Sequence, residues 1–182
     1  GGATATFTNG FLASHSVTIT NTGSFTVTAT DSAGGLGTGT EIGVTNAFTV
    51  DPGALDHFVV EAQGGGAIGT QTAGTAFNIQ ITAEDAFNNT QTFFDGAGNT
   101  AEISSTGTLS AGAGTTATFT NGFLASHSVT ISNTGSFTIT ATDSAGGIGS
   151  GTENGVSNSF TVDPGALDHF LVEAAGGGNI GT

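Results

Sequence analysis

The carboxylates are the side chains with the clearest chemical potential, because no Lys or Arg neutralises them. The chain has 182 residues, 14 of them Asp or Glu, and a formal net charge of −14. Ca²⁺ takes roughly six to eight oxygen ligands, so uncompensated carboxylates favour a calcium site. Two candidate groups are an aspartate pair that occurs twice, Asp51 and Asp56 with Asp163 and Asp168, and a turn that contains Asp85, Asn88 and Asn89.

Neither calcium candidate has the spacing of an EF-hand loop, and Asp and Asn are also ordinary turn formers. A bound Ca²⁺ and simply solvated carboxylates therefore both remain open. Without Lys or Arg, no salt bridge is expected.

Serine and histidine stand together at Ser126-His127-Ser128, and the same three residues recur at Ser14-His15-Ser16. A hydrolase triad needs a nucleophile held by its general base at about 3 Å, usually beside an oxyanion hole. In an alternating strand, however, neighbouring side chains point to opposite faces. We therefore expect no enzymatic activity and no organic cofactor. The four histidines are two positions repeated, without the spacing of a transition-metal site: His15, His57, His127 and His169.

The missing residue types exclude several partners. Without cations the chain cannot neutralise nucleic-acid phosphates or an anionic membrane surface. It has no Cys for disulfides, and no apolar run approaches the roughly 18 residues of a membrane span, so direct membrane insertion is not expected. Hydrophobic residues make up 36% of the chain and include 14 Phe, enough for a folded core. The chain has no initiator Met or signal peptide, which is typical of an internal piece of a longer protein.

An internal repeat dominates the chain. Residues 1–70 align without a gap on residues 113–182 and differ at 12 of 70 positions. A period of 112 residues is too long for a solenoid coil and has the size of one domain.

The domain boundaries follow from FTVDPGALDHF, which occurs at 48–58 and 160–170 and holds the only two prolines. Proline belongs at strand starts or junctions, and Pro-Gly marks a turn. We call each Asp-Pro-Gly junction a seam. The two seams predict a complete domain at 52–162, the C-terminal part of a preceding repeat at 1–51, and the N-terminal part of a following repeat at 163–182.

The predicted secondary structure is all-β. In AFNIQITAED, alternation places Phe77, Ile79, Ile81 and Ala83 on one face. Further strands are expected at HFVVEA, near TQTFF, and at AEISS, TATFT, SVTIS, SFTITATD and SNSFTV, with Gly- and Asn-rich turns between them. Seven to nine short strands in about 110 residues are typical of an antiparallel β-sandwich.

The order of these segments resembles a known family. ITAEDAFNN, AEISSTGTLS, an FTNG turn, SFTITATDSAGG and a closing SNSFTV are similar to the bacterial immunoglobulin-like (Big) repeats of invasin- and intimin-type adhesins. Many relatives have Gly where this chain has Asn88. The resemblance implies tandem Ig-like sandwiches in a cell-surface or extracellular protein, acting as a stalk or spacer and sometimes stiffened by calcium. The partners it implies are neighbouring repeats of the same chain.

Two other functions remain open. One is a self-assembling extracellular filament or sheath subunit, because no Lys protects the sheet edges from pairing. Its negative charge opposes such packing unless cations such as Ca²⁺ screen it. The other is a carbohydrate- or receptor-binding module, which the absence of Trp, Tyr and Arg disfavours.

Overall fold

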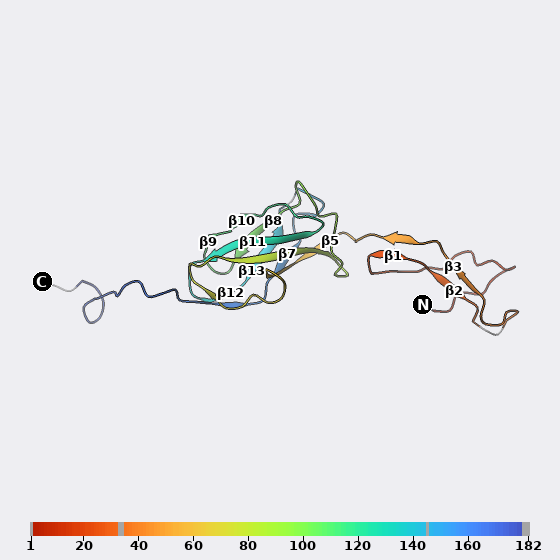
Figure 1. The fold of residues 1–182 in the computed structure, drawn as a ribbon, viewed down its shortest axis with the longest axis horizontal. Coiled ribbons are helices and arrows are strands. Elements are labelled where there is room, and N and C mark those ends of the chain that lie inside the picture. The colour runs from red at the N-terminus through yellow and green to blue at the C-terminus, as the bar shows by residue number, and fades with distance from the viewer. Residues whose placement is uncertain (1, 33–34, 145, 180–182) are drawn as a thin grey trace.

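The protein is all-β in the computed structural model, which describes residues 2–32, 35–144 and 146–179. Within these ranges there is no helix, and hence none long and apolar enough to cross a membrane. A central body spans residues 55–163, an N-terminal segment with its own strands precedes it, and a C-terminal tail follows it. The segment and the tail leave the central body from opposite ends (Figure 1).

The central body consists of short strands that pair mostly with antiparallel neighbours. In chain order they are β5 Leu55–Ala62, β6 Gln71–Thr72, β7 Phe77–Asp85, β8 Ala101–Ser105, β9 Leu109–Ala111, β10 Gly114–Thr115, β11 Phe123–Ile131, β12 Gly135–Phe137, β13 Ile139–Asp143, β14 Asn154–Val156 and β15 Phe160–Asp163. One sheet has the order β10-β8-β13-β14-β5-β7-β11-β9, and another has the order β12-β15-β6.

Two parallel pairings connect the beginning of the central body to its end. Asn154 of β14 lies opposite His57 of β5, and Val162 of β15 lies opposite Gln71 of β6. The first two strands of the body, β5 and β6, therefore run parallel to its last two, β14 and β15, respectively. The chain consequently enters the body at one pole and leaves it at the other.

The core consists of inward-facing side chains from both halves of the eight-stranded sheet. Alternation in β7 buries Ile79, Ile81 and Ala83, as predicted. Ile103 of β8 and Ile139 of β13 belong to the same buried cluster. Because strands far apart in the sheet order share one core, the sheet folds over itself, which is consistent with the predicted β-sandwich.

Two predicted strands are wrong, at TQTFF and TATFT. Residues 91–94 form a turn in which the Phe94 N–H donates to the Gln91 carbonyl at 2.9 Å. Phe119 is bonded to a loop instead of a strand, since its N–H donates to the Asn99 carbonyl and its own carbonyl accepts the Gly96 N–H. Both Phe side chains are buried. The apolar residues in these two stretches therefore indicate packing in the core and not strand formation. Hydrogen bonds within loops satisfy the backbone groups of Phe94 and Phe119.

The N-terminal segment contains two small antiparallel pairs. Its strands are β1 Gly23–Phe25, β2 Thr28–Thr30, β3 Ile42–Val44 and β4 Phe48–Val50. β1 pairs with β4, and β2 with β3, in the same register that β12–β15 and β13–β14 use 112 residues later. The repeated sequence thus forms the same hairpin twice.

Candidate functional site

The first seam is held by two buried side chains, Asp85 at the end of β7 and Gln91 in the loop that follows it. The Gly53 N–H donates to Asp85 Oδ2 at 2.8 Å, and Gln91 Nε2 donates to the Gly53 carbonyl. Asp85 is the last residue of β7, and both side chains are buried. Both backbone groups of the glycine after Pro52 therefore have a fixed partner, and the link between the two segments is anchored to the central body.

Asp85 also organises its own turn. Its Oδ1 accepts the Phe87 N–H at 2.9 Å and the Asn89 N–H at 3.0 Å, and the Asn89 side-chain amide donates to both carboxylate oxygens. Asn88, between them, has a φ of 62°, a left-handed conformation that Asn tolerates better than most residues. The carboxylate that the sequence offers as a calcium ligand is thus surrounded by N–H donors.

These bonds determine the pKa of Asp85. Burial raises it, but the hydrogen bonds from the Asn89 side chain and from the Gly53, Asn89 and Phe87 backbones outweigh burial and lower the pKa from 3.8 to about 2. The side chain therefore stays ionised at neutral pH although it is only 2% exposed.

Asn89 extends the contact to the preceding segment. Its Nδ2 donates to the Thr20 carbonyl at 2.7 Å, and its Oδ1 accepts the Thr22 N–H at 3.3 Å. Thr20 and Thr22 lie in the loop just before β1. One side chain thus bonds both to Asp85 and, across the seam, to the N-terminal segment. Together, Gly53, Asp85, Asn89 and Gln91 form a joint between consecutive parts of the chain.

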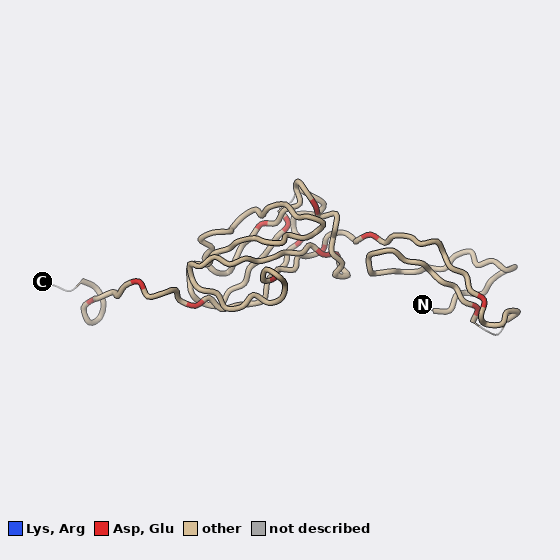
Figure 2. Tube along the Cα trace, viewed as in Figure 1, with Lys and Arg blue, Asp and Glu red and all other residues tan. Residues whose placement is uncertain are grey.

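The other predicted ligands lie apart from this joint or on its surface. Asp51, Asp56, Asp163 and Asp168 are exposed, as is Asn88. In the part of the chain that the structure describes, no three His, Asp or Glu side chains come together in a group that could hold a metal ion. The carboxylates are instead distributed along the whole length of the molecule (Figure 2).

His57 lies between two carboxylates, although the chain has no Lys or Arg to pair with them. Its Nδ1 lies 3.1 Å from Asp56 Oδ2, and its Nε2 lies 3.4 Å from Glu84 Oε2. The imidazole therefore becomes an ion-pair partner of two carboxylates whenever it is protonated. His169 repeats only the first contact, with Asp168 at 2.9 Å.

No family model, curated protein or solved structure matches this chain.

The predicted serine–histidine group lies in β11. His127 Nε2 donates to the Gly112 carbonyl at 2.9 Å, which ties the ring to the β9–β10 loop. The pairing of β11 with β7 shifts register between Leu124 and His127. In this position the imidazole bonds to a main-chain carbonyl rather than to a serine hydroxyl.

A second pair of carboxylates shapes the Gly-rich loop after β13. Asp143 Oδ2 accepts the Gly151 N–H at 2.8 Å, and Glu153 accepts the Ser150 N–H and hydroxyl. Asp31 and Glu41 make the equivalent bonds in the N-terminal segment. There the Thr38 hydroxyl and nearby backbone N–H groups lower the pKa of Glu41 to about 2. Acid residues in this chain thus act as acceptors that close loops.

The residue types at Asp85 and Asn89 indicate a turn, but nothing in the local sequence connects this turn to the seam. Gln91 was missed entirely, and its only signal is an amide in the apolar stretch around Phe93 and Phe94. Gly53 is 32 residues from Asp85 along the chain, and no local pattern relates the two.

We expect stability to decline in acid because of Asp85. Its pKa of about 2 in the folded protein lies below its ordinary value of 3.8, so the unfolded chain binds more protons between these values. The contribution of Asp85 to the free energy of unfolding should therefore be constant above about pH 4.5 and should fall by about 2 kcal/mol as the pH falls from 4 to 2. Urea denaturation across this range measures the slope, which should shrink in Asp85→Asn and persist in the exposed variant Asp56→Asn. An equal slope in all three proteins would assign the effect to other carboxylates.

Proposed function

We propose that this chain is a non-enzymatic structural repeat of a large extracellular or cell-surface protein, where it acts as a stalk or spacer. In this proposal Ig-like β-sandwich units of the bacterial immunoglobulin-like type follow one another every 112 residues. Residues 52–162 are one complete unit, and 1–51 and 163–182 belong to its neighbours. The support comes from the sequence repeat and from a central body that begins and ends at the two seams.

The observation that carries the proposal is the joint. A spacer needs units that keep a defined orientation. Here the buried side chains of Asp85 and Gln91 form hydrogen bonds to the backbone of Gly53, and Asn89 bonds to the preceding segment. Flexible linkers instead leave their backbone solvated and free of the domains. A short, hydrogen-bonded seam with a proline therefore favours restricted bending.

The route of the chain through the unit also supports a spacer. Because the first two strands of the body run parallel to the last two, entry and exit lie at opposite poles. Successive units then extend an array instead of folding back on it. The partners in this proposal are neighbouring repeats, and no site in it depends on nucleic acid or a cofactor.

Electron microscopy of an array of several units tests the stalk. We expect stiff rods, and we expect Asn89→Ala in every unit to broaden the distribution of angles between neighbours. This substitution removes both bonds to the preceding segment and one donor to Asp85. Its cost within each unit is about 1 kcal/mol, so the units stay folded.

The matched control is Asn78→Ala, an exposed Asn of β7 whose amide contacts only Gln63 within the same body. This variant should leave the angles unchanged. Wild-type arrays that look like freely jointed beads would contradict the proposal, as would equal bending in the two variants.

A further inference from the structure

The N-terminal segment exposes apolar side chains that the central body buries at equivalent positions. Phe7 is 56% exposed while Phe119 is 1% exposed, and Val17 is 52% exposed while Val129 is fully buried. Of the 51 positions in residues 1–51, nine differ from residues 113–163. The difference in burial therefore comes from the strands that surround the second copy.

The hairpin of the segment is already formed, with both edges open. In the described residues β2 and β3 pair only with each other. Their counterparts have further partners, because β13 also pairs with β8 and β14 also pairs with β5. An unpaired edge presents a row of backbone donors and acceptors to an incoming strand. The segment thus offers a preformed template with two vacant edges.

Glycines in the N-terminal segment have open space where their counterparts in the central body lie against another part of the chain. A Cβ on Gly155 would lie 1.7 Å from the Phe58 carbonyl oxygen of β5, so this position must be glycine in the central body. A Cβ on its counterpart Gly43 would meet nothing within 4 Å. In the same way Gly147 lies against Asn99, while Gly35 is free of contacts. The open space beside Gly43 and Gly35 is therefore large enough for chain segments equivalent to those that lie against Gly155 and Gly147.

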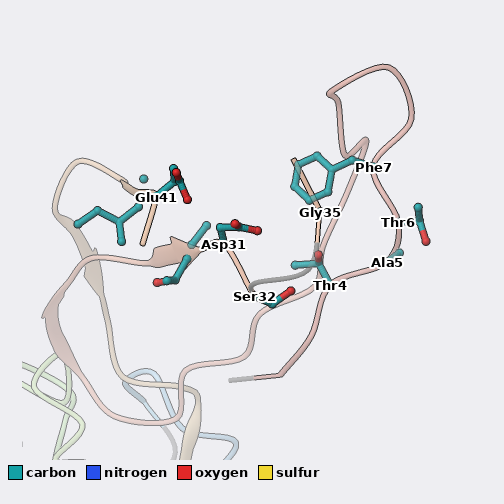
Figure 3. A pocket seen from close by; sticks show the side chains of 12 residues that line it. Thr4, Ala5, Thr6, Phe7, Asp31, Ser32, Gly35 and Glu41 are labelled. Atoms are coloured by element: carbon teal, nitrogen blue, oxygen red, sulfur yellow. The ribbon is translucent and has the colours of Figure 1, made fainter. Parts of the chain in front are cut away.

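The open face is hollowed. A hollow of about 640 Å³ is lined by residues that include Phe7, Ala29, Asp31 and Ile42 (Figure 3). Ala141 and Asp143, the counterparts of Ala29 and Asp31, are buried in the central body. In the complete unit β8 and β5 instead pair with β13 and β14, the counterparts of β2 and β3.

The segment cannot take these strands from the residues that directly follow it. In the central body, Val162 follows Asn154, the residue opposite His57, by eight residues, and β5 begins two residues before His57. An extended chain over these positions covers up to about 33 Å. Val50, the counterpart of Val162, is joined to Leu55 by five residues, which span at most about 18 Å. Moreover, residues 52–112 are already paired with residues 113–163.

We propose that residues 1–51 are a strand acceptor for a second copy of the segment 52–112, in the pairing that residues 113–163 already use. The β2 edge takes β8, the β3 edge takes β5, and Phe7, Val17 and Phe48 become core. This inference rests on the repeat architecture of the proposed function and specifies its recognition surface.

The test is a chain with a second copy of residues 52–112 fused before residue 1, which keeps the 112-residue phase. We expect the calorimetric unfolding enthalpy to rise about twofold, because two complete units replace one. Hydrogen exchange of the β2 and β3 amides should slow by at least about 100-fold, since they join a cooperative unit. Unchanged exchange and unchanged enthalpy would overturn the proposal.

Two variants make the result specific. Phe48→Ser should leave the stability of the 182-residue chain unchanged, because Phe48 is not part of its core, but should restore fast exchange of β3 in the fused chain. Ile79→Ser with Ile81→Ser in the added copy alone should prevent completion while the original unit stays folded. If Phe48→Ser leaves the exchange of the β3 amides in the fused chain unchanged, the proposal is overturned. The electron-microscopy test measures stiffness between complete units, so the two ideas can fail separately.

Discussion

Replacing Asp85 with alanine is expected to lower the free energy of unfolding by about 3 kcal/mol. The variant removes an ionised acceptor that receives N–H groups from Gly53, Phe87 and Asn89. Hydrogen bonds to charged groups are stronger than neutral ones, and donors left unmatched beside a buried cavity keep their desolvation cost. Urea denaturation followed by circular dichroism measures the loss.

The same variant should also release the seam. Hydrogen exchange of the Gly53 amide should accelerate well beyond the exchange of core amides such as Ile81. Asp56→Ala is the matched control, since Asp56 is exposed and its carboxylate lies beside the neighbouring His57 at 3.1 Å. It should change stability by less than about 0.5 kcal/mol. A loss equally small in Asp85→Ala would show that the carboxylate is not what holds the seam.

Phe119→Ala is expected to cost about 4 kcal/mol, the largest effect of a single substitution that we anticipate. Phe119 packs against Phe58 and Phe94 with ring centroids 5.8 and 4.9 Å away, the second in an edge-to-face arrangement. Truncation removes both contacts and leaves a cavity that the surrounding sheet cannot close fully. The shift in urea midpoint measures this loss.

The chain contains its own control for this experiment. Phe7 occupies the equivalent position 112 residues earlier, in the same local sequence, but is largely exposed. Phe7→Ala should therefore change stability by less than about 0.5 kcal/mol. Comparable losses in the two variants would mean that the N-terminal segment has a core of its own, against the exposure seen here.

The fold was predictable where side-chain alternation and strand pairing agree. Ile79, Ile81 and Ala83 alternate with polar neighbours and form the buried face of β7. The same reasoning failed at Phe94 and Phe119, because burial of an aromatic side chain does not require a paired backbone. Their backbone groups bond within loops. Alternation therefore predicts which side chains are buried more reliably than it predicts which residues are strands.

The joint was predictable only in its parts. The seam follows from Pro52 and the turn from Asp85 and Asn89, since all three residue types have known local preferences. Their mutual contact depends on the path of β5 and β7, which places Leu55 opposite Asp85 and brings Gly53 within reach. The bond from Asn89 to Thr20 spans 69 residues. Such contacts arise from tertiary packing and leave no mark in the local sequence.

The parallel pairings of β5 with β14 and of β6 with β15 have a mechanical consequence. A pull on the two seams would draw the strands of each pair in opposite directions along their axes, so the contacts between them would be loaded in shear. Asn158 adds to this load path, because its side chain accepts the Ile68 N–H at 2.8 Å and donates to the Ile68 carbonyl at 2.9 Å. Ala73 adds a further bond, to the Asp163 carbonyl at the exit seam. Tension would thus pass through the unit between strands that are adjacent in space but about 100 residues apart in sequence.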